Sequence, residues 1–311
     1  MSTFPDAVPL AVPHSVDKAE SAQPVRPRPG SFRRVWWRHG LAILALVWSL
    51  FPIVFIISAA LNPSGTMNTA ELFPKNISMT NYDALFSDTA RPYLSWYKNS
   101  MIIAGSGSLA SVFIGACAAY AFSRMRFTGR RPGLFALLLL QMFPALLAFV
   151  ALYVTFVRVG NILPAIGINT SAGLILAYLG GAMGANVWLL KGYFDTVPRE
   201  LDEAAKVDGA SHARIFFTMT LRLVMPILVT VFMLSFVGLF GEFLLASIFL
   251  RDVDSQTLGV GLWSMMNVTG DRNKYFGQFC AGAMLASLPV VLLYLGFQKQ
   301  LVGGLTQGSV K

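Results

Sequence analysis

Long apolar runs recur along this 311-residue chain and constrain its fold more than any other feature. A membrane-crossing helix needs about 20 residues, because the hydrocarbon core is about 30 Å thick and a helix rises 1.5 Å per residue. Six runs are long enough, and only one of them contains a charged residue, Glu242. The runs are Leu41–Leu61, Asn99–Ser123, Gly133–Val157, the part of Val159–Leu190 that begins at Ala172, Leu223–Leu250 and Tyr275–Gln298. The sequence therefore predicts an all-α membrane protein with six transmembrane helices. The third run contains Pro144, which is expected to kink the helix, as membrane helices tolerate.

The Lys and Arg residues fall unevenly on the two sides of these helices. The side that holds both termini and the 191–222 loop carries 17 of the 24, and the opposite side carries seven. Because cytoplasmic loops are enriched in Lys and Arg, both termini are predicted to be cytoplasmic. The net charge of +9 does not indicate a nucleic-acid partner, since the basic residues flank the apolar runs and form no single patch.

The two ends of the chain differ in composition from the membrane domain predicted at 41–299. Residues 1–40 are polar and contain six prolines. A segment of this composition cannot bury enough apolar surface to fold alone, so we predict a disordered cytoplasmic tail. It does not resemble a cleaved signal, because the first apolar run begins late and is long. Residues 300–311 are predicted to form a cytoplasmic C-terminal tail.

A charged, helix-rich segment interrupts the apolar pattern between Lys191 and Pro226. Pro198 suits the start of a helix, and Glu200, Asp202 and Glu203 place negative charge at its positive end. Gly209 suits a left-handed helix end, after which Ala210 and Ser211 can begin a second helix. A small, slightly apolar face is formed at helical spacing by Leu201, Ala204, Ala205 and Asp208. This helix–Gly–helix segment is either a docking surface for a soluble protein or a solvated helix without a partner.

The residues of this segment resemble a known motif. PRELDEAAKVDGA at 198–210, followed by Pro226, is similar to the EAA loop of permease subunits in binding-protein-dependent ABC importers. The resemblance implies a type I importer permease fold, with a loop at about 194–222 that docks in a cleft of a separate ATPase. The residues implied to couple to it are Glu203, Ala204, Ala205, Asp208 and Gly209. The family usually has Leu-Pro shortly before Pro226, whereas this chain has Leu221-Arg222. The sequence therefore does not decide whether the chain bends at this point.

A second resemblance covers about residues 95–311. LRDVDSQTLGVG at 250–261 and the terminal LVGGLTQGSVK are similar to the smaller permease of maltose-type importers. In that group an external loop, here about 250–274, projects into the extracytoplasmic sugar-binding protein, and the C-terminal tail lies against the ATPase. The implied residues are Ser255, Gln256, Thr257, Leu258 and Gly259 in the loop and Gln307, Gly308 and Ser309 in the tail.

The resemblance also implies the partners and the cofactors of the chain. It predicts a second homologous permease subunit, two ATPase subunits and the binding protein, in the cytoplasmic membrane. ATP and Mg²⁺ belong to the partner ATPase, and no cofactor is expected on this chain. In maltose-type importers the other permease supplies most sugar contacts, so no sugar-binding residue is assigned here.

Glu242 is the one ionisable residue deep in a predicted span. A charge at this depth costs about 2.5–3.5 kcal/mol on insertion scales. One interpretation is that Glu242 faces a water-filled translocation path or a polar group on another span, such as Gln141 or Asn186. The other is a hydrogen-bonded or protonated residue with a purely structural role.

Other classes of protein fit the sequence less well. The chain lacks a G-x-x-x-x-G-K-[ST] phosphate loop and a constellation of catalytic or metal-binding residues, so it is not expected to be an enzyme. A stand-alone secondary transporter would show several intramembrane charges and an internal repeat. We therefore predict a permease subunit that moves maltose- or maltodextrin-like sugars by alternating access. The alternative cargoes are trehalose, another oligosaccharide or glycerol phosphate.

Overall fold

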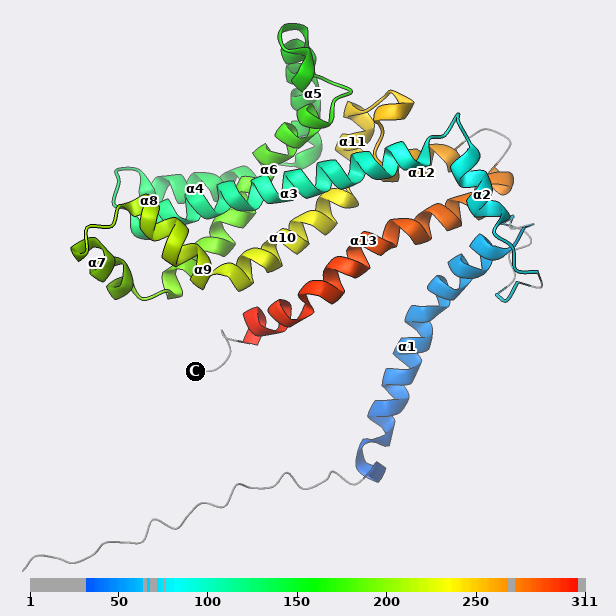
Figure 1. Ribbon diagram of the computed structural model, residues 1–311, viewed down its shortest axis with the longest axis horizontal. Coiled ribbons are helices and arrows are strands. Elements are labelled where there is room, and N and C mark those ends of the chain that lie inside the picture. Colours follow the sequence, from blue (N-terminus) through cyan, green and yellow to red (C-terminus); the bar gives the residue numbers. More distant parts are fainter. Residues whose placement is uncertain (1–31, 64–65, 68–71, 75, 268–271, 307–311) are drawn as a thin grey trace, which may run out of the picture. The chain divides into compact units, whose positions relative to one another are not determined.

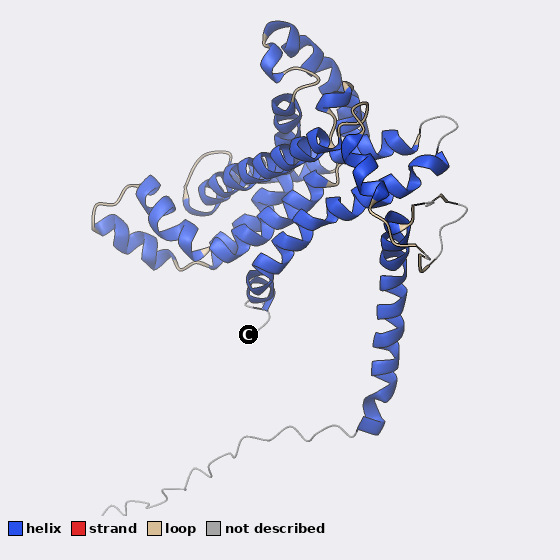
Figure 2. Ribbon diagram, turned by 45° about the vertical axis from the view of Figure 1, so that its right-hand side comes forward, coloured by secondary structure: helices blue, strands red, loops and turns tan. Residues whose placement is uncertain are grey.

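A computed structural model describes residues 32–63, 66–67, 72–74, 76–267 and 272–306. The chain divides into two units, Met1–Leu50 and Phe51–Lys311. Every regular element in the described residues is a helix or a helical turn (Figure 1; Figure 2). The predicted all-α class is therefore confirmed.

Short connections join the helices, except between α1 and α2, which end and begin at Leu61 and Thr80. Long helices are α1 (Phe32–Leu61), α3 (Tyr93–Arg124), α5 (Ala145–Ile162), α6 (Ser171–Thr196), α10 (Met225–Phe240) and α13 (Arg272–Thr306). The shorter ones are α2 (Thr80–Ser87), α4 (Arg130–Gln141), α7 (Arg199–Val207), α8 (His212–Ile215), α9 (Leu221–Leu223), α11 (Leu244–Phe249) and α12 (Leu258–Met266). A π-helical turn at Phe216–Thr220 joins α8 to α9, and 3₁₀ turns lie at Pro164–Ile166 and Val253–Ser255.

The number of spans depends on how bent helices are counted. Among the described residues, four unbroken helices, α1, α3, α5 and α13, are long and apolar enough to cross a membrane. The two halves of α6 meet at 58°, and the helical stretch His212–Leu223 meets α10 at 78°. If each bent pair counts as one span, the total reaches the predicted six.

Several predicted boundaries differ from the structure. Helix α1 begins at Phe32, inside the segment predicted to be disordered up to residue 40, because no proline follows Pro29 until Pro52. The third predicted span is interrupted: α4 ends at Gln141, and α5 begins after Pro144, whose backbone is extended. Proline lacks the N–H that a continuous helix needs and disfavours a helical residue before it, so Pro144 breaks the span and does not merely bend it.

Helix α3 lies at the centre of the second unit. It packs along α6 and α10, and α10 packs in turn against α13 (Figure 1). A buried cluster joins α3, α6 and α10 near residues 194–222, the predicted coupling segment, and includes Ala116, Tyr120, Phe194 and Val231. A second cluster joins the opposite half of α3 to α12 and α13 through Trp96 and other buried side chains. The two ends of α3 are thus embedded in different parts of the core.

Candidate functional site

The segment between α6 and α10 has the predicted helix–Gly–helix form. Helix α7 begins directly after Pro198 and ends at Val207. Gly209 has φ +79°, a conformation that glycine adopts without the steric cost of a side chain. Ser211 then caps α8 by accepting a hydrogen bond from the backbone N–H of Arg214 at 3.3 Å. The sequence therefore predicted both the end of the first helix and the start of the second.

Helix α7 has a buried face and an exposed face. Asp202 and Ala205, three residues apart, are buried. Four of the five residues that the motif assigned to coupling are exposed: Glu203, Ala204, Asp208 and Gly209. Val207, at the end of the helix, is 88% exposed. Ala205 is turned into the protein, so it is unavailable to a partner unless the helix shifts.

Arg124 at the end of α3 fixes the buried face of α7. Its Nε lies 3.1 Å from Asp202 Oδ2, and the two side chains are only 3% and 8% exposed. Its Nη2 also donates to the carbonyl oxygens of Phe194 at 2.9 Å and Val197 at 2.6 Å, at the end of α6. One guanidinium group therefore joins α3, the end of α6 and α7. A buried charge needs such partners, because it is costly to remove from water.

Two further contacts support this junction. Ser123 donates to Asp195 Oδ1 at 2.6 Å, and Lys191 Nζ lies 2.5 Å from Asp195 Oδ2. The Tyr120 hydroxyl donates to the carbonyl oxygen of His212 at 3.4 Å, which connects α3 to the start of α8. Both helices of the coupling segment are thus tied to the same end of α3.

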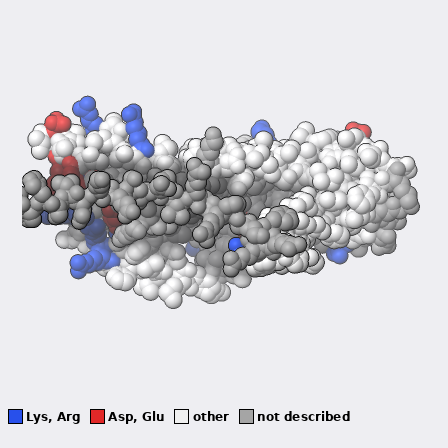
Figure 3. Space-filling view, turned by 90° about the horizontal axis from the view of Figure 1, so that it is seen from below, with Lys and Arg blue, Asp and Glu red and all other residues white. Residues whose placement is uncertain are grey.

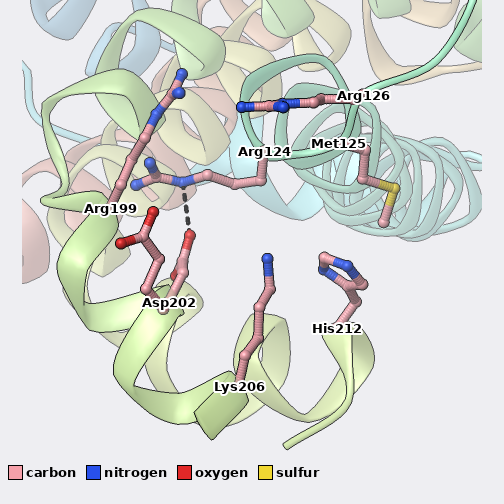
Figure 4. Close-up of a pocket in the computed structure, with 8 residues that line it drawn as sticks. Arg124, Met125, Arg126, Arg199, Asp202, Lys206 and His212 are labelled. Carbon is pink, nitrogen blue, oxygen red and sulfur yellow. Dashed lines mark ion pairs between the residues drawn. The ribbon is translucent and has the colours of Figure 1, made fainter.

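A polar cleft of about 510 Å³ opens beside this junction (Figure 4). Its lining carries five basic or imidazole side chains, two carboxylates and Met125. These are Arg124, Arg126, Arg199, Lys206 and His212, with Asp202 and Glu203. Figure 4 shows Lys206 and His212 on the α7–α8 side of the cleft, and Arg124 and Arg126 on the α3 side. In the described part of the chain no group of three or more His, Cys, Asp or Glu side chains is placed to hold a metal ion.

The helix continues through Arg222, the residue that replaces the proline of the family motif. Helix α9 reaches Leu223, and the sharp bend comes at Val224, directly before α10, which has Pro226 in its first turn. The bend that the sequence left open is therefore present, and it lies beside the proline that the chain retains.

At the other end of α3, side chains hold the external loop. Trp96 Nε1 donates to the carbonyl oxygen of Val253 at 2.7 Å. Asn99 Nδ2 donates to the carbonyl oxygens of Asp254 at 2.8 Å and Gln256 at 3.0 Å. The backbone N–H of Leu258 donates to Ser100 Oγ at 2.7 Å. Three residues within one and a half turns of α3 thus fix the path of the loop.

Asn169, before α6, holds the beginning of the same loop. Its Oδ1 accepts from the backbone N–H groups of Arg251 at 2.6 Å and Asp252 at 3.3 Å, while its own N–H donates to the carbonyl oxygen of Phe249 at 2.9 Å. Asn169 has φ +60°, which few residues other than glycine adopt and which Asn tolerates. The residue type therefore matches both its backbone and its contacts.

The most exposed residues of the 250–274 loop come before Ser255–Gly259, the residues that the motif predicted to contact a partner. Residues 251–254 are exposed, whereas Ser255, Gln256 and Gly259 are partly buried. Thr257 and Leu258 are 3% and 1% exposed and form the start of α12. The part of this loop that a partner protein can contact is therefore Arg251–Asp254 with the edge of Ser255 and Gln256.

Glu242 lies in a break between α10 and α11 and not within a continuous helix. Its carboxylate accepts from the Tyr178 hydroxyl and from the backbone N–H groups of Leu245 at 2.8 Å and Ala246 at 3.0 Å. The partners expected from the sequence, Gln141 and Asn186, are not the ones found: Asn186 donates instead to Ser111. Glu242 thus caps the first turn of α11, the helix that leads into the external loop.

The third set of predicted site residues, Gln307, Gly308 and Ser309, lies outside the described residues. The residues that sequence reasoning missed are Arg124, Asp202 and Asn169. Arg124 stands in the sequence as the first of four arginines after an apolar run and as the end of a stretch, 119–124, that shares the family resemblance, but neither feature indicates that it pairs with Asp202. A lone asparagine in a loop gives no sign of its contacts.

Comparison with known proteins gives a consistent result. Residues 111–306 match the model of the family described as "Binding-protein-dependent transport system inner membrane component". The maltose/maltodextrin transport system permease protein MalG of Vibrio vulnificus strain YJ016 is 41% identical over 289 residues, which cover 89% of this chain and 96% of that protein. The protein of the same name from Escherichia coli strain K12 is 39% identical over the same shares of both chains.

Two solved structures share the fold. One is a bacterial ABC transporter involved in the import of the acidic polysaccharide alginate, with a TM-score of 0.74 and 22% identity over 88% of this chain and 99% of that chain. The other is a bacterial alginate ABC transporter in complex with an alginate-pentasaccharide-bound periplasmic protein. Its TM-score is 0.60 at 16% identity, over 86% and 94% of the two chains. At these identities the likeness concerns the fold alone.

The buried ion pair predicts unequal effects of two neighbouring substitutions. Asp202→Asn leaves Arg124 with an uncompensated buried charge, which costs about 3 kcal/mol. The melting temperature of the detergent-purified transporter should therefore fall by roughly 6 °C or more. Glu200→Gln removes a carboxylate charge from an exposed position of the same helix and should leave the melting temperature nearly unchanged. Equal shifts for the two variants would show that the ion pair does not hold α7.

Asn169 permits a second test, with two variants that separate its amide from its backbone. Asn169→Gly keeps the left-handed backbone and removes the acceptor, whereas Asn169→Asp keeps an acceptor. In hydrogen–deuterium exchange the amides of Arg251 and Asp252 should exchange about ten-fold faster in the Gly variant, because they lose their partner. The Asp variant should remain close to the unsubstituted protein. Equal exchange in all three proteins would contradict this role of the side chain.

Proposed function

Because the chain belongs to the inner-membrane components of binding-protein-dependent transport systems, we propose that it is the permease subunit of an ATP-driven importer for maltose- or maltodextrin-like sugars. It crosses the membrane several times and works with a second, homologous permease subunit. Two ATPase subunits lie on the cytoplasmic side, where both termini also lie, and the sugar-binding protein is extracytoplasmic. The cargo rests on the names of relatives about 40% identical over most of their length.

The observation that carries this proposal is the construction of α7. Its exposed face holds Glu203, Ala204, Asp208 and Gly209, and its buried face is fixed to α3 and α6 by Arg124. The exposed face of α7 can bind a partner, while its buried face is fixed to two long helices. A movement of the partner can therefore be transmitted through α7 to α3 and α6. We infer that the ATPase binds the exposed face and that closure of the ATPase moves α3 and α6 with α7.

On the other side of the membrane, the exposed loop residues Arg251–Asp254 face the sugar-binding protein. The loop is held at Asn169 and along α3, so its position follows the position of these helices. A loop that moves with α3 connects the state of the binding protein to the state of α7. By reciprocity, a loaded binding protein must favour the same membrane conformation as the closed ATPase.

Glu242 fits a structural role in this scheme better than a place in the translocation path. Its carboxylate is occupied by the Tyr178 hydroxyl and by two backbone N–H groups of α11. It thereby holds the helix that precedes the external loop. The C-terminal residues Gln307, Gly308 and Ser309 are proposed to contact the ATPase, on the strength of the resemblance alone.

The coupling role predicts different outcomes for two exposed carboxylates on α7. Glu203→Lys reverses a charge on the proposed ATPase-binding face, and we expect sugar uptake to fall at least about ten-fold, as for an interface charge that meets the wrong sign. ATP hydrolysis should continue but should lose its stimulation by the loaded binding protein. Glu200→Lys makes the same change one turn earlier and should keep most of the uptake. Both activities are measured on the transporter reconstituted in vesicles.

Normal stimulation and normal uptake in the Glu203→Lys variant would count against the coupling assignment. Loss of uptake in both variants would indicate that charge on α7 matters in general and that the exposed face has no specific role.

A further inference from the structure

The turn between α3 and α4 borders a second, shallow basic hollow, to which the proposed transport mechanism assigns no role. Gly129 has φ +93° and precedes α4 without a side-chain cap. The hollow, of about 410 Å³, is lined by six consecutive or nearly consecutive residues of the turn: Arg126, Phe127, Gly129, Arg130, Arg131 and Pro132. Lys and Arg side chains gather at this end of the second unit (Figure 3).

The hollow is basic, although Arg130 is close enough to Asp195 to interact with it electrostatically and Arg126 also lines the cleft beside α7. Its lining contains three arginines and no carboxylate, whereas the neighbouring cleft at α7 contains Asp202 and Glu203. Arg130 is partly buried and donates to the carbonyl oxygen of Ser123 at 3.4 Å. Arg126 and Arg131 are exposed, and in the described part of the chain neither has an acidic partner within ion-pair distance. Two exposed guanidinium groups are thus available to an anion.

The surroundings of the hollow are apolar on one side. Phe127 at its rim is 44% exposed, and α4 continues with exposed Phe135 and Leu139, at 65% and 67%. In an inner-membrane protein a face of this kind contacts lipid tails, and the arginines at its end then lie at the level of the lipid head groups. Basic pockets beside membrane helices on the cytoplasmic side are suited to anionic head groups.

We propose that Arg126 and Arg131 bind the phosphate of an anionic phospholipid whose acyl chains lie along α4. An arginine fork matches phosphate oxygens with two parallel N–H groups, and the exposed α4 face matches the chains. An acidic partner protein would match the charges but not the adjoining apolar helix. The inference depends on the membrane topology and not on the identity of the transported sugar.

The test counts lipid molecules bound to the complete transporter. The complex is purified in detergent, delipidated and titrated with phosphatidylglycerol, and native mass spectrometry counts the bound molecules. Separate titrations use phosphatidylcholine and inorganic phosphate. We expect one phosphatidylglycerol whose affinity falls roughly ten-fold or more in the double variant Arg126→Gln/Arg131→Gln. A Lys double variant at the same positions should retain most of the binding, which shows that the site survives substitution.

A matched control removes two other exposed arginines on the predicted cytoplasmic side, Arg214→Gln/Arg222→Gln. It should bind phosphatidylglycerol like the unsubstituted protein. Equal loss in the control would mean diffuse attraction to basic residues, and equal binding of phosphatidylcholine would mean that the charge is not recognised. Phosphatidylglycerol binding that is unchanged in the double variant would also overturn the proposal, as would displacement of the lipid by millimolar phosphate. If the double variant loses the ATPase and keeps the lipid, the hollow binds an acidic protein surface.

Discussion

The attachment of α7 to the membrane domain depends on one buried guanidinium group. Arg124 pairs with the Asp202 carboxylate and donates to two carbonyl oxygens at the end of α6, and the Arg124 and Asp202 side chains are almost fully buried. Uncompensated, such a charge would be strongly destabilising, so the three segments have to stay together around it. A short surface helix thereby becomes a fixed part of the membrane domain. Without this constraint, α7 would be an appendage whose movement need not affect the helices in the membrane.

Helix α3 connects this junction to the outer side. Its first turns hold the external loop through Trp96, Asn99 and Ser100, and its last turn holds α7 through Arg124. Its 32 residues extend over about 48 Å, more than the thickness of a bilayer core. One rigid helix therefore contacts both surfaces that are proposed to meet partners. A tilt of α3 moves α7 and the 250–274 loop at the same time. Coupling between these two surfaces therefore does not require a series of small rearrangements through the core.

The sequence predicted the local features and missed those that depend on contacts between distant residues. Gly209, Ser211 and Pro198 have strong local preferences, and the helix–Gly–helix form follows from them. The break at Pro144 was predicted only as a kink, because composition alone does not show whether neighbouring helices support a bent span. The partner of Glu242 was missed for a similar reason. Tyr178 is 64 positions away in the sequence, and the sequence does not show which of the many polar residues on other helices lies beside Glu242. Ala205 belongs to a motif of coupling residues, yet its burial is decided by the position of Asp202 against Arg124.

The most direct measurement of the central claim is the structure of the assembled transporter in its nucleotide-free and ATP-bound states, determined by electron cryomicroscopy. The account predicts that the exposed face of α7 is buried against the ATPase in both states. It also predicts that Arg124 stays within ion-pair distance of Asp202 while α3 tilts relative to the membrane. A structure in which α7 contacts no ATPase, or in which α7 moves away from Arg124 between the two states, would contradict it.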